Sequence, residues 1–143
     1  STYIVKLFHA VFAAINCHAL AITTGKGKYI KLARPYIALI KQFGKAGSPS
    51  TSPMIALLDA EYQMYCGRLS KAESLYWDAV AGFSSNKFFL LEAIAYERLG
   101  RCLVAAKTDA SKARLETAWH KYADFGATVK LDQMMRDYEC LAD

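Results

Sequence analysis

Side chains that could bind a metal are few in this sequence and widely spaced. His9, Cys17 and His18 come closest to a metal site, but a zinc site needs more ligands, grouped at regular intervals. His9 and His18 are nine residues apart, which puts them on nearly opposite sides of a helix. Histidines that belong to the core or to its edge are the favoured interpretation, and no metal site is predicted.

A thiol nucleophile with a histidine base is the second chemistry to weigh. His120 could act with Cys102 or Cys140, yet no nearby sequence feature would activate a thiol and no oxyanion cradle is recognisable. The segment TGKGKY, residues 24–29, contains glycine and lysine without the spacing of a phosphate-binding loop or a preceding strand. We therefore predict a protein without enzymatic activity and without a cofactor.

Lysine and arginine residues are concentrated near the N-terminus. Residues 1–50 contain seven of them and no Asp or Glu, a net charge of +7, whereas the rest of the chain contributes −2 to the total of +5. Four of these cations are spaced by three, seven and four residues, so they line one face of a helix. The candidate partner-binding residues are Lys26, Lys28, Lys31, Arg34, Lys41 and Lys45.

Three interpretations of this basic cluster stay open. A helix that buries apolar stripes must expose another face to water, so a solvated face is the simplest interpretation. Docking on an acidic surface of a protein partner or a neighbouring domain comes second. Nucleic acid or anionic lipid comes third, because the stretch lacks a recognised nucleic-acid motif and its aromatic residues belong to the inward stripes.

Apolar residues recur at intervals of three and four along almost the whole chain, which indicates an all-α fold. The 143 residues, 54% of them hydrophobic, are enough for a single domain with one core. Breaks rich in glycine, serine or proline divide the chain into about seven helices: a basic helix pair over residues 1–45, then hairpins and a C-terminal helix over 53–143. Because the chain begins with Ser1 within an apolar run, we expect it to be a piece of a longer protein.

Several single elements carry definite expectations. Residues 7–22 are too few for a membrane span of about 20 residues and include polar side chains, so we interpret them as a core helix apolar nearly all round. Pro35 should kink the second helix or mark a new start near Ala33. Ser70 and Glu73 form a capping box that opens the fourth helix. The third helix is expected to turn inward Ile55, Leu58, Tyr62 and Tyr65.

The spacing of the cysteines indicates the redox conditions of the cellular compartment. The four cysteines show neither a C-x-x-C pair nor a regular framework, which is typical of buried thiols in a reducing environment. We therefore expect a cytoplasmic protein.

Two hairpins repeat a spacing of small and bulky residues. Small side chains let antiparallel helices approach closely, so the cost of Gly100 within a helix, roughly 1 kcal/mol, would be offset by the approach of the next helix. The intervals are twelve, four and three in the first hairpin and eleven, four and three in the second. The repeat positions are Ala60, Ala72, Tyr76 and Ala79, then Gly100, Ser111, Leu115 and Ala118.

This spacing resembles the tetratricopeptide repeat (TPR), whose helical hairpins stack into a right-handed array. Residues 26–138 further resemble the TPR-like helical region that follows the AAA-type ATPase module in multi-sensor signalling proteins with GAF sensors and hybrid histidine kinases. The residues that carry this likeness best are Phe125, Gly126, Ala127, Lys130, Leu131 and Tyr138.

The resemblance implies a non-enzymatic module for protein–protein interaction or interdomain connection in a cytoplasmic signal-transduction protein. Its partner would be another protein or a flanking domain of the same chain, and a homodimer stays open. The alternative is a module that binds anions or nucleic acid through the basic cluster of residues 26–45, although nucleic acid is disfavoured as a partner.

Overall fold

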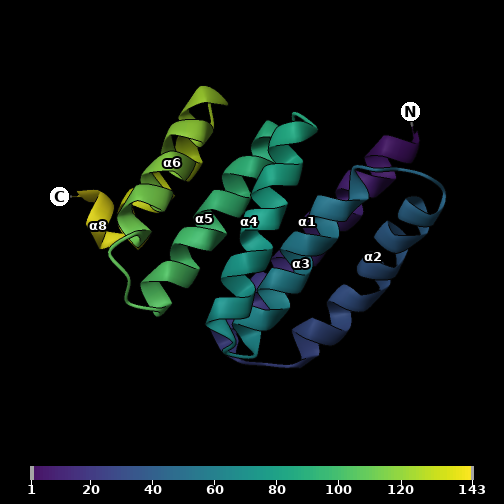
Figure 1. Ribbon diagram of the computed structural model, residues 1–143, viewed down its shortest axis with the longest axis horizontal. Coiled ribbons are helices and arrows are strands. Elements are labelled where there is room, and N and C mark those ends of the chain that lie inside the picture. Colours follow the sequence, from purple (N-terminus) through teal and green to yellow (C-terminus); the bar gives the residue numbers. More distant parts are fainter. Residues whose placement is uncertain (1, 143) are drawn as a thin grey trace.

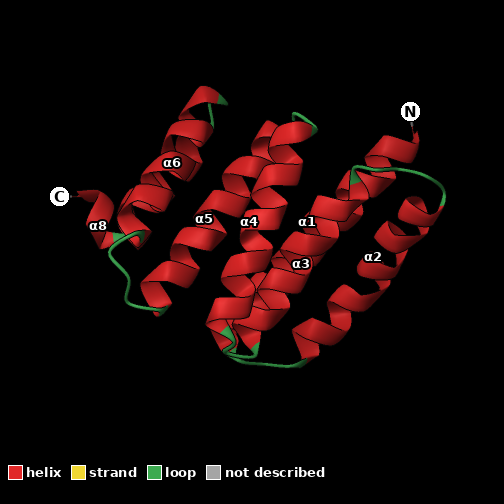
Figure 2. Ribbon diagram, viewed as in Figure 1, coloured by secondary structure: helices red, strands yellow, loops and turns green. Residues whose placement is uncertain are grey.

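The computed structural model describes residues 2–142, which form eight α-helices and no strand (Figure 1; Figure 2). The prediction of an all-α fold is confirmed. The helices are α1 (Thr2–Thr24), α2 (Lys28–Lys45), α3 (Thr51–Tyr65), α4 (Leu69–Ser85), α5 (Phe89–Ala105), α6 (Ser111–Asp124), α7 (Thr128–Asp137) and α8 (Glu139–Ala142).

Neighbouring helices pack as antiparallel pairs, α1 with α2, α3 with α4 and α5 with α6. Contacts of α3 with α1 and α2, and of α5 with α4, join these pairs into one array. The pairs follow one another along the long axis, so that the two ends of the chain lie at opposite ends of the molecule (Figure 1). In the view of Figure 1, α1 lies behind α3.

The C-terminal region contains two helices where one was predicted. Tyr138 has an extended backbone, with φ −120° and ψ 101°, and this residue separates α7 from the short α8. Leaving the helix lets the Tyr138 hydroxyl reach the buried carboxylate of Glu97 on α5. A tertiary hydrogen bond thus accompanies a break that the apolar periodicity does not reveal.

The capping box expected at Ser70 is wrong, and of the two outcomes expected at Pro35 the new helix start is excluded. α2 runs without interruption through Pro35, so no new helix starts near Ala33. Pro35 is exposed, where water can hydrate the carbonyl group that loses its partner. α4 begins at Leu69, directly after the turn at Gly67 and Arg68, and has no side-chain cap. Ser70 is therefore already helical and does not open the helix with Glu73.

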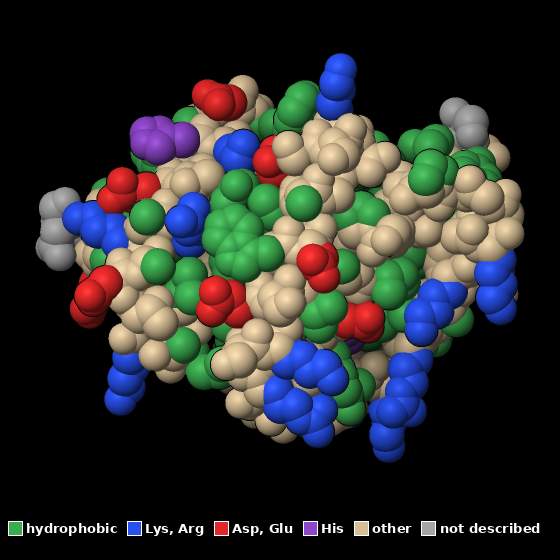
Figure 3. All heavy atoms as spheres, in the orientation of Figure 1, with side chains coloured by type: hydrophobic (Ala, Val, Ile, Leu, Met, Phe, Trp, Pro, Cys, Tyr) green, Lys and Arg blue, Asp and Glu red, His purple; other side chains and the backbone are tan. Residues whose placement is uncertain are grey.

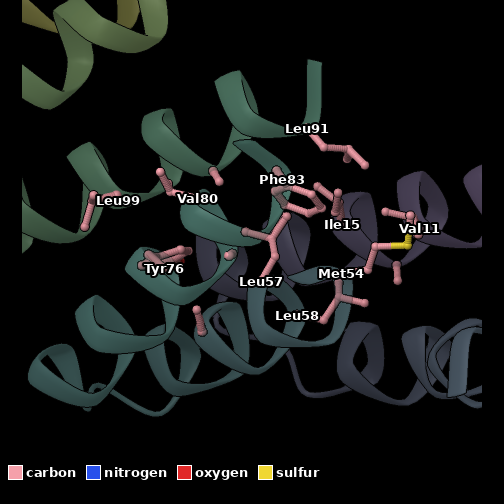
Figure 4. Packing of buried hydrophobic residues seen from close by; sticks show 14 of the residues in the cluster. Val11, Ile15, Met54, Leu57, Leu58, Tyr76, Val80, Phe83, Leu91 and Leu99 are labelled. Atoms are coloured by element: carbon pink, nitrogen blue, oxygen red, sulfur yellow. The ribbon is translucent and has the colours of Figure 1, made fainter. Parts of the chain in front are cut away.

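The core is built mainly from α1, α3, α4 and α5 (Figure 4). Ile15, Leu57, Phe83 and Leu91 come from these four helices and belong to one buried cluster. A smaller cluster, which includes Met134 of α7, joins α5, α6 and α7.

The helix α1 is less buried than its composition predicted. It contributes Leu7 and Val11 to the core, but Ile4, Val5 and Leu20 are exposed. By length and composition α1 could cross a membrane, and 39% of its most apolar window is buried within the fold.

Candidate functional site

A groove of about 910 Å³ opens between α1, α5 and α7. Its surface combines apolar side chains with hydrogen-bonding and charged ones, the mixture that a bound segment of another chain requires. Residues that line it include Phe12, Ile15 and Asn16 of α1, Ile94, Arg98 and Arg101 of α5, and Lys130, Gln133 and Asp137 of α7.

A buried ion pair lies beneath the groove. Arg98 Nε is 2.6 Å from Glu61 Oε1, and the side chains of these residues are 9% and 0% exposed. At this distance the two charges compensate each other directly. The Tyr76 hydroxyl donates a hydrogen bond to the other carboxylate oxygen of Glu61. The pair thus links α3 to α5, and Tyr76 links it to α4.

The electrostatics of this network keep Tyr76 and Arg98 protonated. Burial and the adjacent charge of Glu61 raise the pKa of Tyr76 well above its usual value, so the hydroxyl keeps its proton. Burial alone would lower the pKa of Arg98, but the charge and hydrogen bond of Glu61, with smaller contributions from Tyr76 and Glu97, together raise that pKa. The network is therefore a fixed structural element at neutral pH.

A second network surrounds Glu97 on α5. Lys130 Nζ and the Tyr122 hydroxyl each lie 2.9 Å from Glu97 Oε1, and the Tyr138 hydroxyl donates to Oε2 over 2.7 Å. Burial alone would raise the pKa of Glu97, but the charge of Lys130 and the hydrogen bonds from all three neighbours lower it on balance. Burial and the Glu97 charge raise the pKa values of both tyrosines, which therefore stay donors.

The two networks share one construction. A glutamate on one odd-numbered helix meets a cation from the next odd-numbered helix and a tyrosine from the helix between them. The same two contacts, glutamate with cation and tyrosine with glutamate, thus recur along the array and tie three successive helices together at each step. The two sets are Glu61, Arg98 and Tyr76, and Glu97, Lys130 and Tyr122.

The predicted inward face of α3 is partly wrong. Leu58 is buried as predicted, but Tyr62 is 42% exposed, Ile55 and Tyr65 are half-buried, and Glu61 takes the inward position. A carboxylate can be buried there because a cation and a hydroxyl compensate it. One signal was available in the sequence: glutamates 36 residues apart, at positions 61 and 97, each stand within an apolar stripe.

The residues weighed as metal ligands do not form a site. His9 is exposed and its ring contacts Tyr36, whereas His18 is buried with no hydrogen-bond partner for Nδ1. Burial lowers the pKa of His18, and the charge of Glu61 opposes this effect without cancelling it. Among residues 2–142 no group of three or more metal-ligating side chains occurs.

The residues weighed for thiol chemistry are also apart. The buried Cys102 thiol donates to the carbonyl of Leu69 over 3.5 Å, and burial raises its pKa to about 11. A neutral thiol of this kind is a weak nucleophile. His120 is exposed on α6 beside Trp119, and Cys140 is half-buried on α8. The structure therefore presents no activated thiol at these positions.

The six basic candidates share one part of the surface. All are exposed, and because α2 is continuous, its last four cations fall within about 80° of arc around the helix axis. Figure 3 shows Lys and Arg side chains toward the right-hand edge, over α2, while the acidic side chains visible in this view lie farther left. These residues are Lys26, Lys28, Lys31, Arg34, Lys41 and Lys45.

The repeat positions lie at helix contacts. A Cβ placed on Gly100 would lie 2.6 Å from both Cγ and Cδ2 of Leu115, so glycine is what allows α6 to approach α5. Ser111 is half-buried at the start of α6. The remaining positions are fully buried: Ala60, Ala72, Tyr76, Ala79, Leu115 and Ala118.

Comparison with known proteins adds no assignment. No family model matches the sequence, and neither a curated protein nor a solved structure matches it.

Proposed function

We propose that this chain is a non-enzymatic module for protein–protein interaction or interdomain connection in a cytoplasmic signal-transduction protein. The observation that carries the proposal is the groove between α1, α5 and α7, whose volume of about 910 Å³ can hold several side chains of a bound segment. A TPR-like role as a scaffold, and the link to multi-sensor signalling proteins, rest on the resemblance of the sequence.

The chemistry of the groove favours a segment with apolar side chains and an acidic group. Phe12, Ile15 and Ile94 offer apolar contact. Arg101 is a half-buried cation of the lining with no ion pair among the described residues, whereas Lys130 is engaged by Glu97. An incoming carboxylate would therefore find Arg101 available for a charge-assisted hydrogen bond.

The buried networks support binding because they fix the shape of the groove. Glu97 on α5 holds Lys130 and Tyr138 at the α7 side, and Arg98 is held from below by Glu61. A surface that is ordered before binding loses less conformational entropy when a partner docks.

Selection of peptides from a random display library tests the proposal. Peptides that bind the wild-type chain should lose about tenfold or more in affinity for Arg101→Glu and for Ile94→Asp, because one loses a cation and the other an apolar contact. Lys71→Glu, an exposed change on α4, is the matched control and should bind normally. Backbone amide shifts on titration should cluster at Asn16, Ile94 and Arg101. Selected peptides that bind all three variants equally would contradict the groove as the site.

A second candidate function has a specific observation in its favour. The six exposed cations of residues 26–45 lie on one continuous helix and the turn before it, so a module that binds anions or nucleic acid is the alternative. Binding to duplex DNA should then weaken steeply with salt and be lost when Lys31, Arg34 and Lys41 become alanine. DNA binding that is insensitive to these changes would contradict it.

A further inference from the structure

Two different stripes border the exposed face of α2, and the apolar one also packs against the core through Tyr36, Leu39 and Phe43. The basic stripe consists of Lys31, Arg34, Lys41 and Lys45, and the apolar stripe, spaced by four, three and four residues, consists of Leu32, Tyr36, Leu39 and Phe43. The basic stripe covers about 80° of arc around the helix axis and the apolar stripe about 60°. The two stripes lie on either side of the direction that points away from the core.

The apolar stripe is partly open to water and continues onto α1. Leu32 is 55% exposed, and Tyr36, Leu39 and Phe43 are half-buried. The Tyr3 ring packs against Phe43 with ring centroids 4.4 Å apart, which places the start of α1 beside the end of α2. Ile4, Val5 and Lys6 near the start of α1 are also exposed, Val5 to 68%.

No acidic side chain reduces the positive charge along this part of the chain. Residues 1–50 contain no Asp or Glu, and none of the six cations of residues 26–45 forms an ion pair with another described residue. The helix of 18 residues presents this charge over about 27 Å. The positive charge of this surface is therefore complementary to that of an extended anionic surface.

We propose that the outer face of α2, together with the start of α1, is a docking surface for a membrane that contains anionic lipids. Lysine-rich clusters on amphipathic helices attract anionic headgroups, and adjacent apolar side chains enter the boundary between headgroups and acyl chains. Nucleic acid would engage the cations but leave the Leu32 side chain, which is 55% exposed, in water. The inference deepens the second candidate function and does not depend on the groove.

Vesicle co-sedimentation at moderate ionic strength tests the proposal. The wild-type chain should bind vesicles of phosphatidylcholine with phosphatidylserine and dissociate from them as the salt concentration rises. It should not bind vesicles of phosphatidylcholine alone. Each cation near an anionic surface strengthens binding about fivefold, so the triple variant Lys31→Gln, Arg34→Gln, Lys41→Gln should lose about 100-fold in affinity.

A matched triple variant controls for net charge. Lys71→Gln, Lys112→Gln and Arg136→Gln remove the same charge from exposed positions on α4, α6 and α7, and this variant should bind vesicles within about threefold of wild type. Leu32→Gln leaves the charge unchanged and should weaken vesicle binding about fivefold through lost apolar burial. Circular dichroism of each variant verifies that the fold is intact.

Three results would overturn the inference. The first is a control triple variant that loses as much affinity as the triple variant on α2. The second is equal binding to neutral and anionic vesicles. The third is binding to duplex DNA or polyglutamate, sensitive to the triple variant on α2, without binding to anionic vesicles. DNA binding without vesicle binding would contradict the membrane proposal but agree with the second candidate function. The failures of the two proposals are therefore distinguishable.

Discussion

The contact between Gly100 and Leu115 allows a sharp test of helix packing. In Gly100→Ala the new Cβ would lie 2.6 Å from Leu115 Cγ and Cδ2 and 3.3 Å from the Leu115 backbone nitrogen. Alanine raises helix propensity by about 1 kcal/mol, but overpacking a rigid core costs about 1 to 3 kcal/mol. Leu115 is fully buried and its Cγ is not the end of a flexible chain. The cost of overpacking should therefore exceed the gain in helix propensity. We expect a net loss of about 1 kcal/mol in the free energy of unfolding.

A double-mutant cycle separates the two contributions. Leu115→Ala alone should cost about 3 kcal/mol because it leaves a cavity. In that background Gly100→Ala removes part of the cavity and should stabilise by about 1 kcal/mol, a coupling of about 2 kcal/mol between the two sites. Urea unfolding followed by circular dichroism measures all four variants. If Gly100→Ala stabilises the wild-type chain by the full propensity gain, the close approach of α5 and α6 is not what requires the glycine.

Three further predictions concern the buried polar groups. Glu61→Gln leaves the charge of Arg98 unpaired and should cost about 3 kcal/mol in urea unfolding, and Arg98→Met added to Glu61→Gln should recover most of it. Tyr138→Phe removes one hydrogen bond to Glu97 and should cost about 1 kcal/mol, with faster amide hydrogen exchange confined to α7 and α8. Because burial lowers the pKa of His18 below its unfolded value of about 6.5, its contribution to stability is intact above that value and is lost as the pH falls below it. His18→Gln should therefore flatten the stability profile between about pH 7 and 5, whereas an unchanged slope would refute the assignment.

The sequence was sufficient for the helices and for one close contact between them. Apolar residues at intervals of three and four predict helices because each buried face must recur with the helical period, and the structure has helices almost where they were expected. Gly100 was informative for a physical reason: an unfavourable residue within a helix implies a compensating feature, and Leu115 supplies it.

Features that depend on tertiary partners were not accessible in the same way. Glu61 faces inward only because Arg98 and Tyr76 meet it there, and neither partner is near it in the sequence. Gly82 is a second close contact that the sequence analysis missed, since a Cβ there would lie 2.5 Å from Pro53 Cβ on α3. A glutamate within an apolar stripe marks position 61 in the sequence, but the partners that explain such residues are identified only by the fold.

The groove and the polar networks are physically coupled. Met134 is the only buried residue of α7 within the described part of the chain, so this helix depends strongly on Lys130 and Tyr138 for its attachment to Glu97. Those two side chains also line the groove. A bound segment that competes for Lys130 would loosen α7, and one that shields the ion pair from water would strengthen its attachment. The position of α7 is therefore the structural variable that occupancy of the groove would change.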